Sequence, residues 1–345
     1  MEVSVNNTRL NDFLALSRRH PWHLEPFTET LPDGTRAEVW DTGVICLEPA
    51  LPAQRDLVIS CGIHGNETAP IELCERLLQQ LVSGRLRCRQ RLLLIFGHPA
   101  AMNAGVRELK ENLNRLFSGA HARGGVESQE RQRAAALEGY VTRFFDARED
   151  GERLHYDLHT AIRPSLHEKF VVHPFTHGAP YSSSQLGLLQ AAGINTILLS
   201  QAPTTTFSYF SARRFGAQAF TIELGKVMPF GQNDLGRLTA LEQCLTALIS
   251  TPGWQPPAPD LARLEVFDVC QEIVKQSENF RLNFSKDVSN FTTFEAGTLL
   301  ATDGERRWCA QSDGEAVVFP NADVAPGQRA ALMVTPVRLT TDQLA

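Results

Sequence analysis

The chain has 345 residues, of which 43% are hydrophobic and 21% charged, values typical of a folded protein with a substantial core. Its length favours about two domains, and its net charge of −6 argues against a general nucleic-acid binder, which would present a basic face. No apolar run approaches the roughly 18 residues that a membrane-spanning helix requires, so we expect no membrane module either.

The cysteine pattern indicates the compartment. The seven cysteines are odd in number and include no Cys-x-x-Cys pair, which favours buried thiols in a reducing compartment over a disulfide framework. The first residues lack the basic and apolar regions of a signal peptide. We therefore expect a cytoplasmic protein.

In chain order, a short helix near residues 10–17 precedes two short strands within 35–47, and strands then alternate with helices to about residue 250. The predicted strands are 56–61, 91–96, 154–158, 170–173, 196–200 and 218–224, and the predicted helices are 68–81, 127–145, 183–192 and 234–250. This alternation predicts an α/β fold with a mostly parallel mixed sheet flanked by helices. Ligands of such sheets gather at the carboxyl ends of the strands.

The proline-rich stretch 251–259 is the clearest boundary in the sequence. We predict a catalytic domain over residues 1–252 and a smaller β-rich domain over residues 253–345. The short strands expected in the second domain are 264–269, 291–294, 298–301, 316–319 and 332–336. We expect this domain to have little catalytic content.

The segment His64-Gly65-Asn66-Glu67 lies between a predicted strand and a predicted helix. A histidine and a glutamate three residues apart at such a junction can face one centre, and both suit zinc, which takes three protein ligands in catalytic sites. Because Gly65 is small, it would let a metal or substrate approach the backbone closely. A lone His-x-x-Glu is a weak signal, however, because so short a motif also arises by chance.

His159 follows another buried strand and offers a third metal ligand. Alone it could equally be a hydrogen-bonded core residue, but with His64 and Glu67 it completes the two-histidine, one-carboxylate set of catalytic zinc sites. Asp157 could orient one of these ligands or could be a structural turn residue.

Glu223 stands at the end of an otherwise apolar strand. A carboxylate in that setting is unfavourable unless it is paired, protonated or functional, so Glu223 is the candidate general base of a hydrolase. A salt-bridged glutamate at the sheet edge is the alternative.

Arg107, Asn114, Arg115 and Arg213 are polar residues that folding alone does not explain. Arginine binds carboxylates in a bidentate fork, and asparagine adds a neutral donor. Each arginine alone could be a solvated surface residue. The Asn114-Arg115 pair lies between apolar residues, however, which favours a buried polar role.

Four motifs thus occur in a specific order, namely His64-x-x-Glu67, Asn114-Arg115, Asp157-Leu158-His159 and Glu223. This set resembles the zinc carboxypeptidase superfamily. Within it the chain is similar to the succinylglutamate desuccinylase and aspartoacylase branch, most of all to the succinylglutamate desuccinylases. The resemblance covers nearly the whole chain, including the β-rich end, and implies a zinc carboxypeptidase-like fold.

The resemblance also implies roles for the residues that match the motifs. His64, Glu67 and His159 would bind one zinc ion, and Glu223 would be the catalytic acid and base. Arg107 lies seven residues before Asn114, as in the aspartoacylase pattern, and would act on the oxyanion side.

Other matching residues would hold substrate carboxylates. Asn114 and Arg115 belong to this set, and the aspartoacylase pattern adds a tyrosine and an arginine fourteen and ten residues before the catalytic glutamate, matched by Tyr209 and Arg213. Arg214 adjoins Arg213 and could take its place. The family's substrate contact from the C-terminal domain matches no residue that we can identify from the sequence.

The implied reaction is hydrolysis of the amide of N2-succinyl-L-glutamate to succinate and L-glutamate, the last step of arginine degradation by the succinyltransferase pathway. An aspartoacylase-like deacylase of another acyl amino acid and a metallocarboxypeptidase remain alternatives within the enzyme class. A non-catalytic zinc-dependent binding protein is the alternative from another class, and the presence of Glu223 disfavours it. A substrate with three carboxylates would need a basic pocket even in an acidic protein. The sequence leaves the oligomeric state open.

Overall fold

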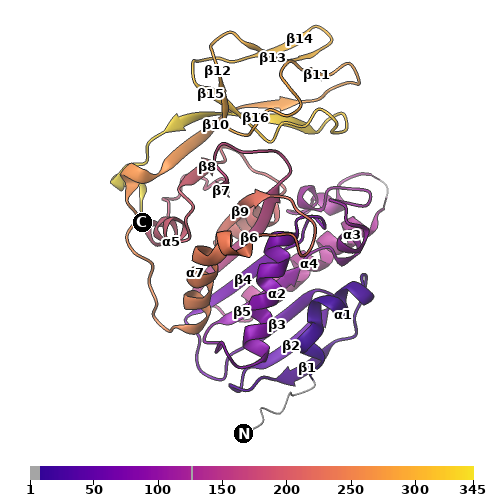
Figure 1. Cartoon of the computed structure of the whole chain (residues 1–345), viewed down its shortest axis with the longest axis vertical. Coiled ribbons are helices and arrows are strands. Elements are labelled where there is room, and N and C mark those ends of the chain that lie inside the picture. The colour runs from indigo at the N-terminus through magenta and orange to yellow at the C-terminus, as the bar shows by residue number, and fades with distance from the viewer. Residues whose placement is uncertain (1–7, 126) are drawn as a thin grey trace.

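One mixed sheet runs through both parts of the chain (Figure 1). A computed structural model describes residues 8–125 and 127–345. The strands are β1 (Phe27–Thr30), β2 (Arg36–Asp41), β3 (Val44–Glu48), β4 (Arg55–Cys61), β5 (Arg91–Phe96), β6 (Glu152–Ala161), β7 (Lys169–His173), β8 (Thr196–Leu199), β9 (Gln218–Lys226), β10 (Glu265–Val274), β11 (Arg281–Leu282), β12 (Thr292–Phe294), β13 (Leu299–Asp303), β14 (Arg306–Cys309), β15 (Glu315–Val318) and β16 (Arg329–Val337). Within the described residues the large sheet has the order β1-β2-β3-β5-β4-β6-β9-β7-β8-β10-β16-β15-β12, and a smaller sheet has the order β11-β13-β14.

The α-helices are α1 (Phe13–Arg19), α2 (Thr68–Val82), α3 (Pro99–Ala104), α4 (Gln129–Asp146), α5 (Ser183–Ala191), α6 (Phe207–Phe215) and α7 (Thr239–Ser250). Short 3₁₀ turns are η1 (Arg9–Asp12), η2 (Leu113–Arg115), η3 (Ala120–Ala122), η4 (Leu235–Leu238), η5 (Leu261–Arg263) and η6 (Thr341–Gln343). Among residues 8–125 and 127–345, none of the helices combines the length and apolar character needed to traverse a bilayer.

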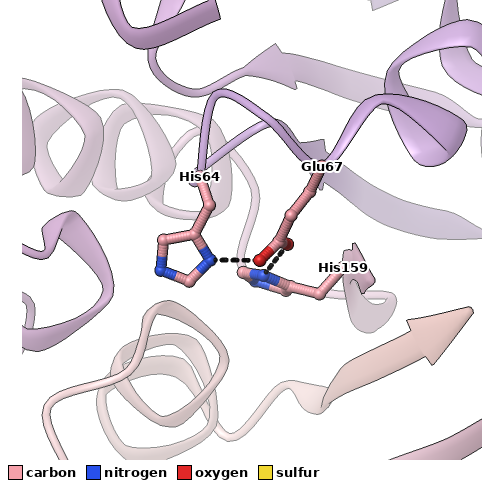
Figure 2. Close-up of side chains that lie close together, drawn as sticks. All are labelled: His64, Glu67 and His159. Atoms are coloured by element: carbon pink, nitrogen blue, oxygen red, sulfur yellow. Dashed lines mark hydrogen bonds and ion pairs between the residues drawn. The ribbon is translucent and has the colours of Figure 1, made fainter. Parts of the chain in front are cut away.

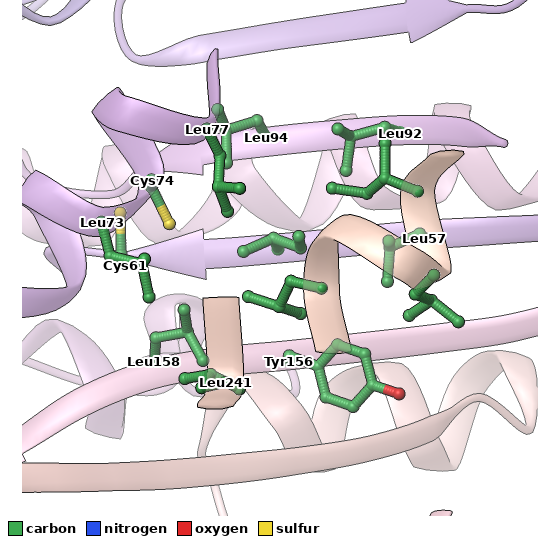
Figure 3. Packing of buried hydrophobic residues seen from close by; sticks show 14 of the residues in the cluster. Leu57, Cys61, Leu73, Cys74, Leu77, Leu92, Leu94, Tyr156, Leu158 and Leu241 are labelled. Atoms are coloured by element: carbon green, nitrogen blue, oxygen red, sulfur yellow. The ribbon is translucent and has the colours of Figure 1, made fainter. Parts of the chain in front are cut away.

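Helices cover both faces of the central sheet. On one face α2, α5 and α7 pack against the strands in a cluster that contains Leu57, Leu92, Tyr156 and Leu158 (Figure 3). On the other face α4 and α6 pack in a second cluster with Val58 and its neighbours. Side chains alternate across a strand, so burial on both faces explains the near-continuous apolar runs of β4 and β5.

The central strands β5, β4, β6 and β9 are parallel to one another, whereas β1, β2 and β3 join antiparallel at one edge. On the other side β7 pairs antiparallel with β9, and β7, β8 and β10 are parallel. The predicted fold, a mixed sheet flanked by helices with a smaller β-rich part, is confirmed. Its parallel pairing is concentrated around β4, β6 and β9, whose carboxyl ends meet at one edge.

The C-terminal part continues this sheet. After the proline-rich stretch, β10 pairs in parallel with β8, from Glu265 opposite Thr196 to Asp268 opposite Leu199. β16 then pairs antiparallel with β10, and the three-stranded sheet lies at the far end of the molecule from the N-terminal strands (Figure 1).

Several element limits differ from the sequence-based prediction. β6 extends to Ala161, so that His159 lies within the strand, and the helix predicted from residue 234 begins with η4 before α7. Helices α3 and α6 and the short strands β1, β11 and β14 occur where we predicted no regular element. These elements are short: β1 pairs with the next strand along the chain, and β11 and β14 both pair with β13.

Candidate metal centre and active site

The loop between β4 and α2 carries the first two candidate ligands. His64 lies in this loop, and Glu67 immediately precedes α2; both side chains are buried. Gly65 has a packing role besides the one expected, because a Cβ there would lie 2.2 Å from the carbonyl carbon of Ala101. The missing side chain lets this loop pack against α3.

His159 completes the group from β6, the strand beside β4. The Nδ1 atom of His64 lies 2.8 Å from Oε1 of Glu67, and the Nδ1 atom of His159 lies 2.8 Å from Oε2 of the same carboxylate (Figure 2). The candidate ligand atoms of the three residues all lie within 4.8 Å of one another. The structure thus brings together the three predicted ligands in a buried group that could hold a metal ion.

The orientation of both rings fits a metal. The Nε2 atom of His64 lies 3.0 Å from Oδ1 of Asn112, and Nε2 of His159 lies 2.9 Å from Oδ2 of Asp157. Without a metal, His159 contacts a carboxylate through each ring nitrogen, and, against the effect of burial, the charges of Asp157 and Glu67 raise its pKa well above the usual value. A metal bound at the Nδ1 atoms would displace the Nδ1 proton of His159 and leave the Nε2 proton of each ring on its acceptor, Asn112 or Asp157. Among the described residues, moreover, the buried Nδ1 of His64 has the ion-pair contact with Glu67 but no hydrogen bond. This donor set fits a divalent metal ion.

A buried polar network supports Asp157. Ser60 of β4 donates a hydrogen bond to Oδ1 of Asp157 at 2.5 Å and lies 2.8 Å from Nε2 of His155. Nδ1 of His155 in turn lies 2.7 Å from the hydroxyl of Ser211 on α6. These side chains occupy the sheet face beneath α6, so the orientation of His159 is held from the core.

The charges of the group are strongly coupled. Against the effect of burial, the charges of His64, His159 and Arg107 hold the pKa of Glu67 well below its usual range. Burial, together with the charge of Arg107, lowers the pKa of His64 to about 4. Glu67 is therefore a carboxylate and His64 a neutral imidazole at neutral pH, the forms in which both bind metals.

Glu223 lies beside this group. Its strand β9 runs parallel to β6, with Glu223 in register with His159. The side chain is buried, and its Oε2 atom has no hydrogen-bond partner among the residues described. Burial and the nearby charge of Glu67 raise the pKa of Glu223 to about 7. In the described part of the chain Glu223 forms no ion pair, which is against the alternative of a salt-bridged glutamate at the sheet edge.

Arg107 and Asn114 make specific contacts near the centre. Arg107 forms an ion pair with Oε1 of Glu67 at 2.5 Å. Asn114 is buried, and its Oδ1 accepts a hydrogen bond from the backbone N–H of Phe207 at 2.9 Å, which ties this loop to the start of α6. Arg115 is half-buried and donates to the carbonyl of Asn114 at 2.9 Å.

The other two predicted residues lie on α6. Tyr209 is buried, with its hydroxyl 3.0 Å from Nε2 of His177. Arg213 lies in the last turn of the helix with an exposed side chain, and it forms no ion pair with any described residue. Arg214 is also exposed, and its guanidinium lies 5.4 Å from the ring centroid of Phe215. The structure therefore brings neither arginine into contact with the metal group.

Comparison with known families agrees with this geometry. A family model described as the succinylglutamate desuccinylase/aspartoacylase catalytic domain matches residues 53–249. The chain belongs to this family. A second model, described as the AstE/AspA barrel-sandwich hybrid domain, matches residues 262–337.

Individual members of the succinylglutamate desuccinylase/aspartoacylase family are similar over nearly the full length. The chain is 50% identical over 343 residues to a succinylglutamate desuccinylase of Idiomarina loihiensis, covering 98% of this chain and 99% of the relative. It is 49% identical over 328 residues to that of Shewanella piezotolerans, covering 94% and 95%. The crystal structure of the succinylglutamate desuccinylase from Chromobacterium violaceum matches with a TM-score of 0.85 and 39% identity, covering 97% of this chain and all of that one.

Sequence reasoning missed Asn112, which contacts His64, and the Ser60–His155–Ser211 network beneath Asp157. The only signal for Asn112 was its place two residues before Asn114. Its contact with His64 joins residues 48 positions apart, and no local pattern shows such a contact.

Proposed function

We propose that this protein is a zinc-dependent amidohydrolase that cleaves N2-succinyl-L-glutamate to succinate and L-glutamate. The observation that carries the proposal is the buried His64–Glu67–His159 group with Glu223 in register beside it. The names of relatives that are about 50% identical supply the substrate. On this proposal the enzyme acts in arginine catabolism in the cytoplasm. Five of the seven cysteines are buried thiols as predicted, whereas Cys270 and Cys309 are exposed; all seven are free, which fits a reducing compartment.

The three ligands would hold one zinc ion per chain. When bound, zinc supplies a Lewis acid that polarises the scissile carbonyl and acidifies a coordinated water. The Nδ1 atoms of the two histidines already lie against the carboxylate of Glu67, so the side chains would move little on binding, and the Nδ1 proton of His159 would be released.

Glu223 would move the proton. In this role it takes a proton from the attacking water and returns it to the nitrogen of the departing glutamate. Its buried position and raised pKa suit a group that must accept and release a proton near neutral pH.

Arg107 would stabilise the negative charge that develops on the carbonyl oxygen, a contribution of about 3 kcal/mol for one donor. Asn114, Arg115, Tyr209 and Arg213 are the proposed partners of substrate carboxylates. Asn114 would act with its amide N–H groups, because its oxygen is engaged by Phe207. Arg213 would need to turn towards the site from its exposed position.

A steady-state comparison tests this function. We expect N2-succinyl-L-glutamate to give the highest kcat/KM among succinylglutamate, succinylarginine, acetylaspartate and a dipeptide. Removal of metal by a chelator should abolish turnover, and zinc should restore it. A better acetylaspartate or dipeptide substrate would replace the proposal with an aspartoacylase-like or carboxypeptidase activity. Tight binding without any turnover would favour a binding protein.

A further inference from the structure

The segment 106–110, which carries Arg107 between α3 and η2, has little apolar packing of its own. Both of its apolar side chains, Val106 and Leu109, are exposed, by 39% and 42%. The carbonyl of Arg107 accepts a hydrogen bond from the backbone N–H of Gly65 at 3.1 Å, and its guanidinium pairs with Glu67. Because buried apolar side chains do not hold this segment, polar contacts fix the position of Arg107.

Glu130, in the first turn of α4, supplies two of these contacts. Its Oε1 atom accepts hydrogen bonds from the backbone N–H groups of Leu109 at 3.0 Å and Lys110 at 2.8 Å. Against the effect of burial, hydrogen bonds from backbone N–H groups, that of Lys110 first, hold the pKa of Glu130 below its ordinary value. Glu130 is therefore ionised at neutral pH, and hydrogen bonds to an ionised acceptor are stronger than those between neutral groups.

The carboxylate of Glu130 is itself enclosed. Its side chain is 1% exposed, and its Oε1 atom lies 3.5 Å from Nε2 of the equally buried His98. His98 precedes α3, and its Nδ1 atom accepts from the backbone N–H of Ala101, so the proton of the ring lies on Nε2 and faces Glu130. A buried carboxylate is unfavourable unless its surroundings compensate it. Here the compensation comes from the start of α3 on one side and from the segment 106–110 on the other.

The same turn of α4 also holds the end of this loop. Arg131 donates to both carboxylate oxygens of Glu111, at 2.9 Å and 2.7 Å, and Ser128 donates to the same carboxylate. Glu111 and the Arg131 side chain are only half-buried, whereas Glu130 is enclosed. Among these three residues of α4, Glu130 makes the contacts that lie closest to Arg107 along the chain.

We propose that Glu130 is a positioning residue, which holds the segment 106–110 so that the guanidinium of Arg107 stays beside Glu67 at the metal centre. This inference rests on the proposed function, in which Arg107 stabilises the developing negative charge, and deepens it by naming the group that fixes this arginine. A glutamate in the first turn of a helix can also stabilise the helix alone. That role would not depend on Arg107, so the two roles are separable.

Hydrogen exchange of backbone amides tests the contact without reference to activity. Glu130→Ala removes the acceptor of two N–H groups, so the amides of Leu109 and Lys110 should exchange at least about tenfold faster than in the parent. Mass spectrometry of peptides that span this segment gives the rates. Unchanged exchange in Glu130→Ala would overturn the inference.

Glu138→Ala is the matched control. Glu138 also lies on α4, where it accepts a hydrogen bond from the backbone N–H of Gly119 at 3.2 Å and lies 3.3 Å from Nε2 of His121. It thus holds a neighbouring loop in the same way, but a loop position to which we assign no catalytic residue. We expect parent-like exchange at Leu109 and Lys110 in this variant, and parent-like kinetics.

A double-mutant cycle with Arg107→Met tests the consequence for catalysis. We expect Glu130→Ala to lower kcat on succinylglutamate about 10- to 100-fold with KM within about threefold, because a misplaced donor is lost to the transition state and its complete removal costs about 10²- to 10³-fold. In the Arg107→Met background the same substitution should change kcat by less than about threefold, since the guanidinium that it positions is already absent. Equal losses in both backgrounds, or a loss through KM alone, would overturn the inference.

Three checks keep the outcomes distinct. If the parent fails to hydrolyse succinylglutamate, the proposed function is wrong, whereas the exchange rates still test whether Glu130 holds the segment. Zinc content is determined on the same samples, and a loss of kcat that follows a loss of zinc would overturn the inference, because Glu130 would then act on the ligands. If circular dichroism shows Glu130→Ala unfolded, Glu130→Gln is assayed instead. Its uncharged oxygen makes weaker hydrogen bonds, so a smaller loss of kcat with the same dependence on Arg107 is expected, and a loss independent of Arg107 would contradict the proposal.

Discussion

At the scale of single residues, the hydrogen-bond acceptors Asn112 and Asp157 determine how the rings of His64 and His159 are oriented. Asp157 and Asn112 each accept from the Nε2 atom of one histidine, which leaves both Nδ1 atoms facing Glu67. One partner is a carboxylate and the other a neutral amide, so the two histidines are held by unequal electrostatic forces. Their roles are therefore separable by substitution.

Asn112→Ala should weaken zinc binding by about 10- to 100-fold, because the proton position and ring orientation of His64 lose their support. Asn112→Asp keeps an acceptor oxygen and should bind zinc close to the parent level. Zinc affinity measured by competition with a chelating dye checks both variants. Parent-like affinity in the alanine variant would show that His64 needs no such support.

His155 predicts a pH dependence of stability. Burial lowers the pKa of His155 to about 4 in the folded protein, against its ordinary value of 6.5, so as the pH falls the unfolded chain takes up the proton before the folded one does. Its contribution is therefore present above pH 6.5 and is lost as the pH falls towards 4. Between pH 7 and 5 the unfolding free energy of the parent should fall about 2 kcal/mol more than that of His155→Gln. Urea denaturation at both pH values gives the comparison, and parallel losses would refute the assignment.

The candidate ligands could be predicted from the sequence because the motifs that carry them occur in a specific order, whereas a histidine or glutamate at one strand end has several other uses. The packing role of Gly65 could not be predicted from the sequence, because it depends on α3, which leaves no room for a side chain at this position. The substrate-binding role expected for Arg213 came from its match to the family pattern, and that match carries no information about the direction of the side chain on α6, which is exposed.

At the scale of elements, the strands β4, β6 and β9 were predictable because each is a buried apolar run. Helix α6 was not, because its aromatic and serine-rich sequence has weak helix propensity. Contacts distant in sequence fix it instead, including Asn114 at its first N–H and the pair formed by Ser208 with Thr221 of β9 at 2.8 Å.

The contact between α3 and the loop that carries His64 gives an element-scale prediction. Gly65→Ala would place Cβ 2.2 Å from backbone carbon of Ala101, so the loop or α3 must shift, and we expect a loss of at least about 2 kcal/mol in unfolding free energy. Gly139→Ala is the control, because Gly139 is exposed within α4 with no atom near an added Cβ. That variant should gain up to about 1 kcal/mol in urea denaturation. Equal stabilities of the two variants would contradict the packing role of Gly65.

At the scale of the whole molecule, the continuous sheet joins the two predicted domains more closely than the linker suggests. The boundary near residue 252 remains our proposal for the division of the chain. A long apolar cluster crosses it, however, since Phe170 and Leu198 pack with Phe291 and Val334. The proline-rich linker was clear from the sequence. The pairing of β10 with β8 across it was not, because the register between two strands distant in the chain cannot be read from the local sequence of either one.

A chain that ends at residue 252 should therefore fold poorly. It would leave the edge of β8 unpaired and expose the Phe170–Leu198 surface, both of which favour aggregation. Size-exclusion chromatography and thermal unfolding followed by circular dichroism would detect aggregates or a broad transition. A monomeric fragment with a cooperative transition near that of the parent would show that the two parts fold independently.

The central claim is that His64, Glu67 and His159 hold the metal while Glu223 transfers the proton. Zinc content per chain and kcat on succinylglutamate, determined on the same sample of Glu223→Gln, test it most directly. We predict one zinc ion per chain, as in the parent, with kcat reduced about 10²- to 10⁴-fold, because the amide cannot accept the proton. A Glu223→Gln variant that carries zinc and turns over as fast as the parent would contradict the account.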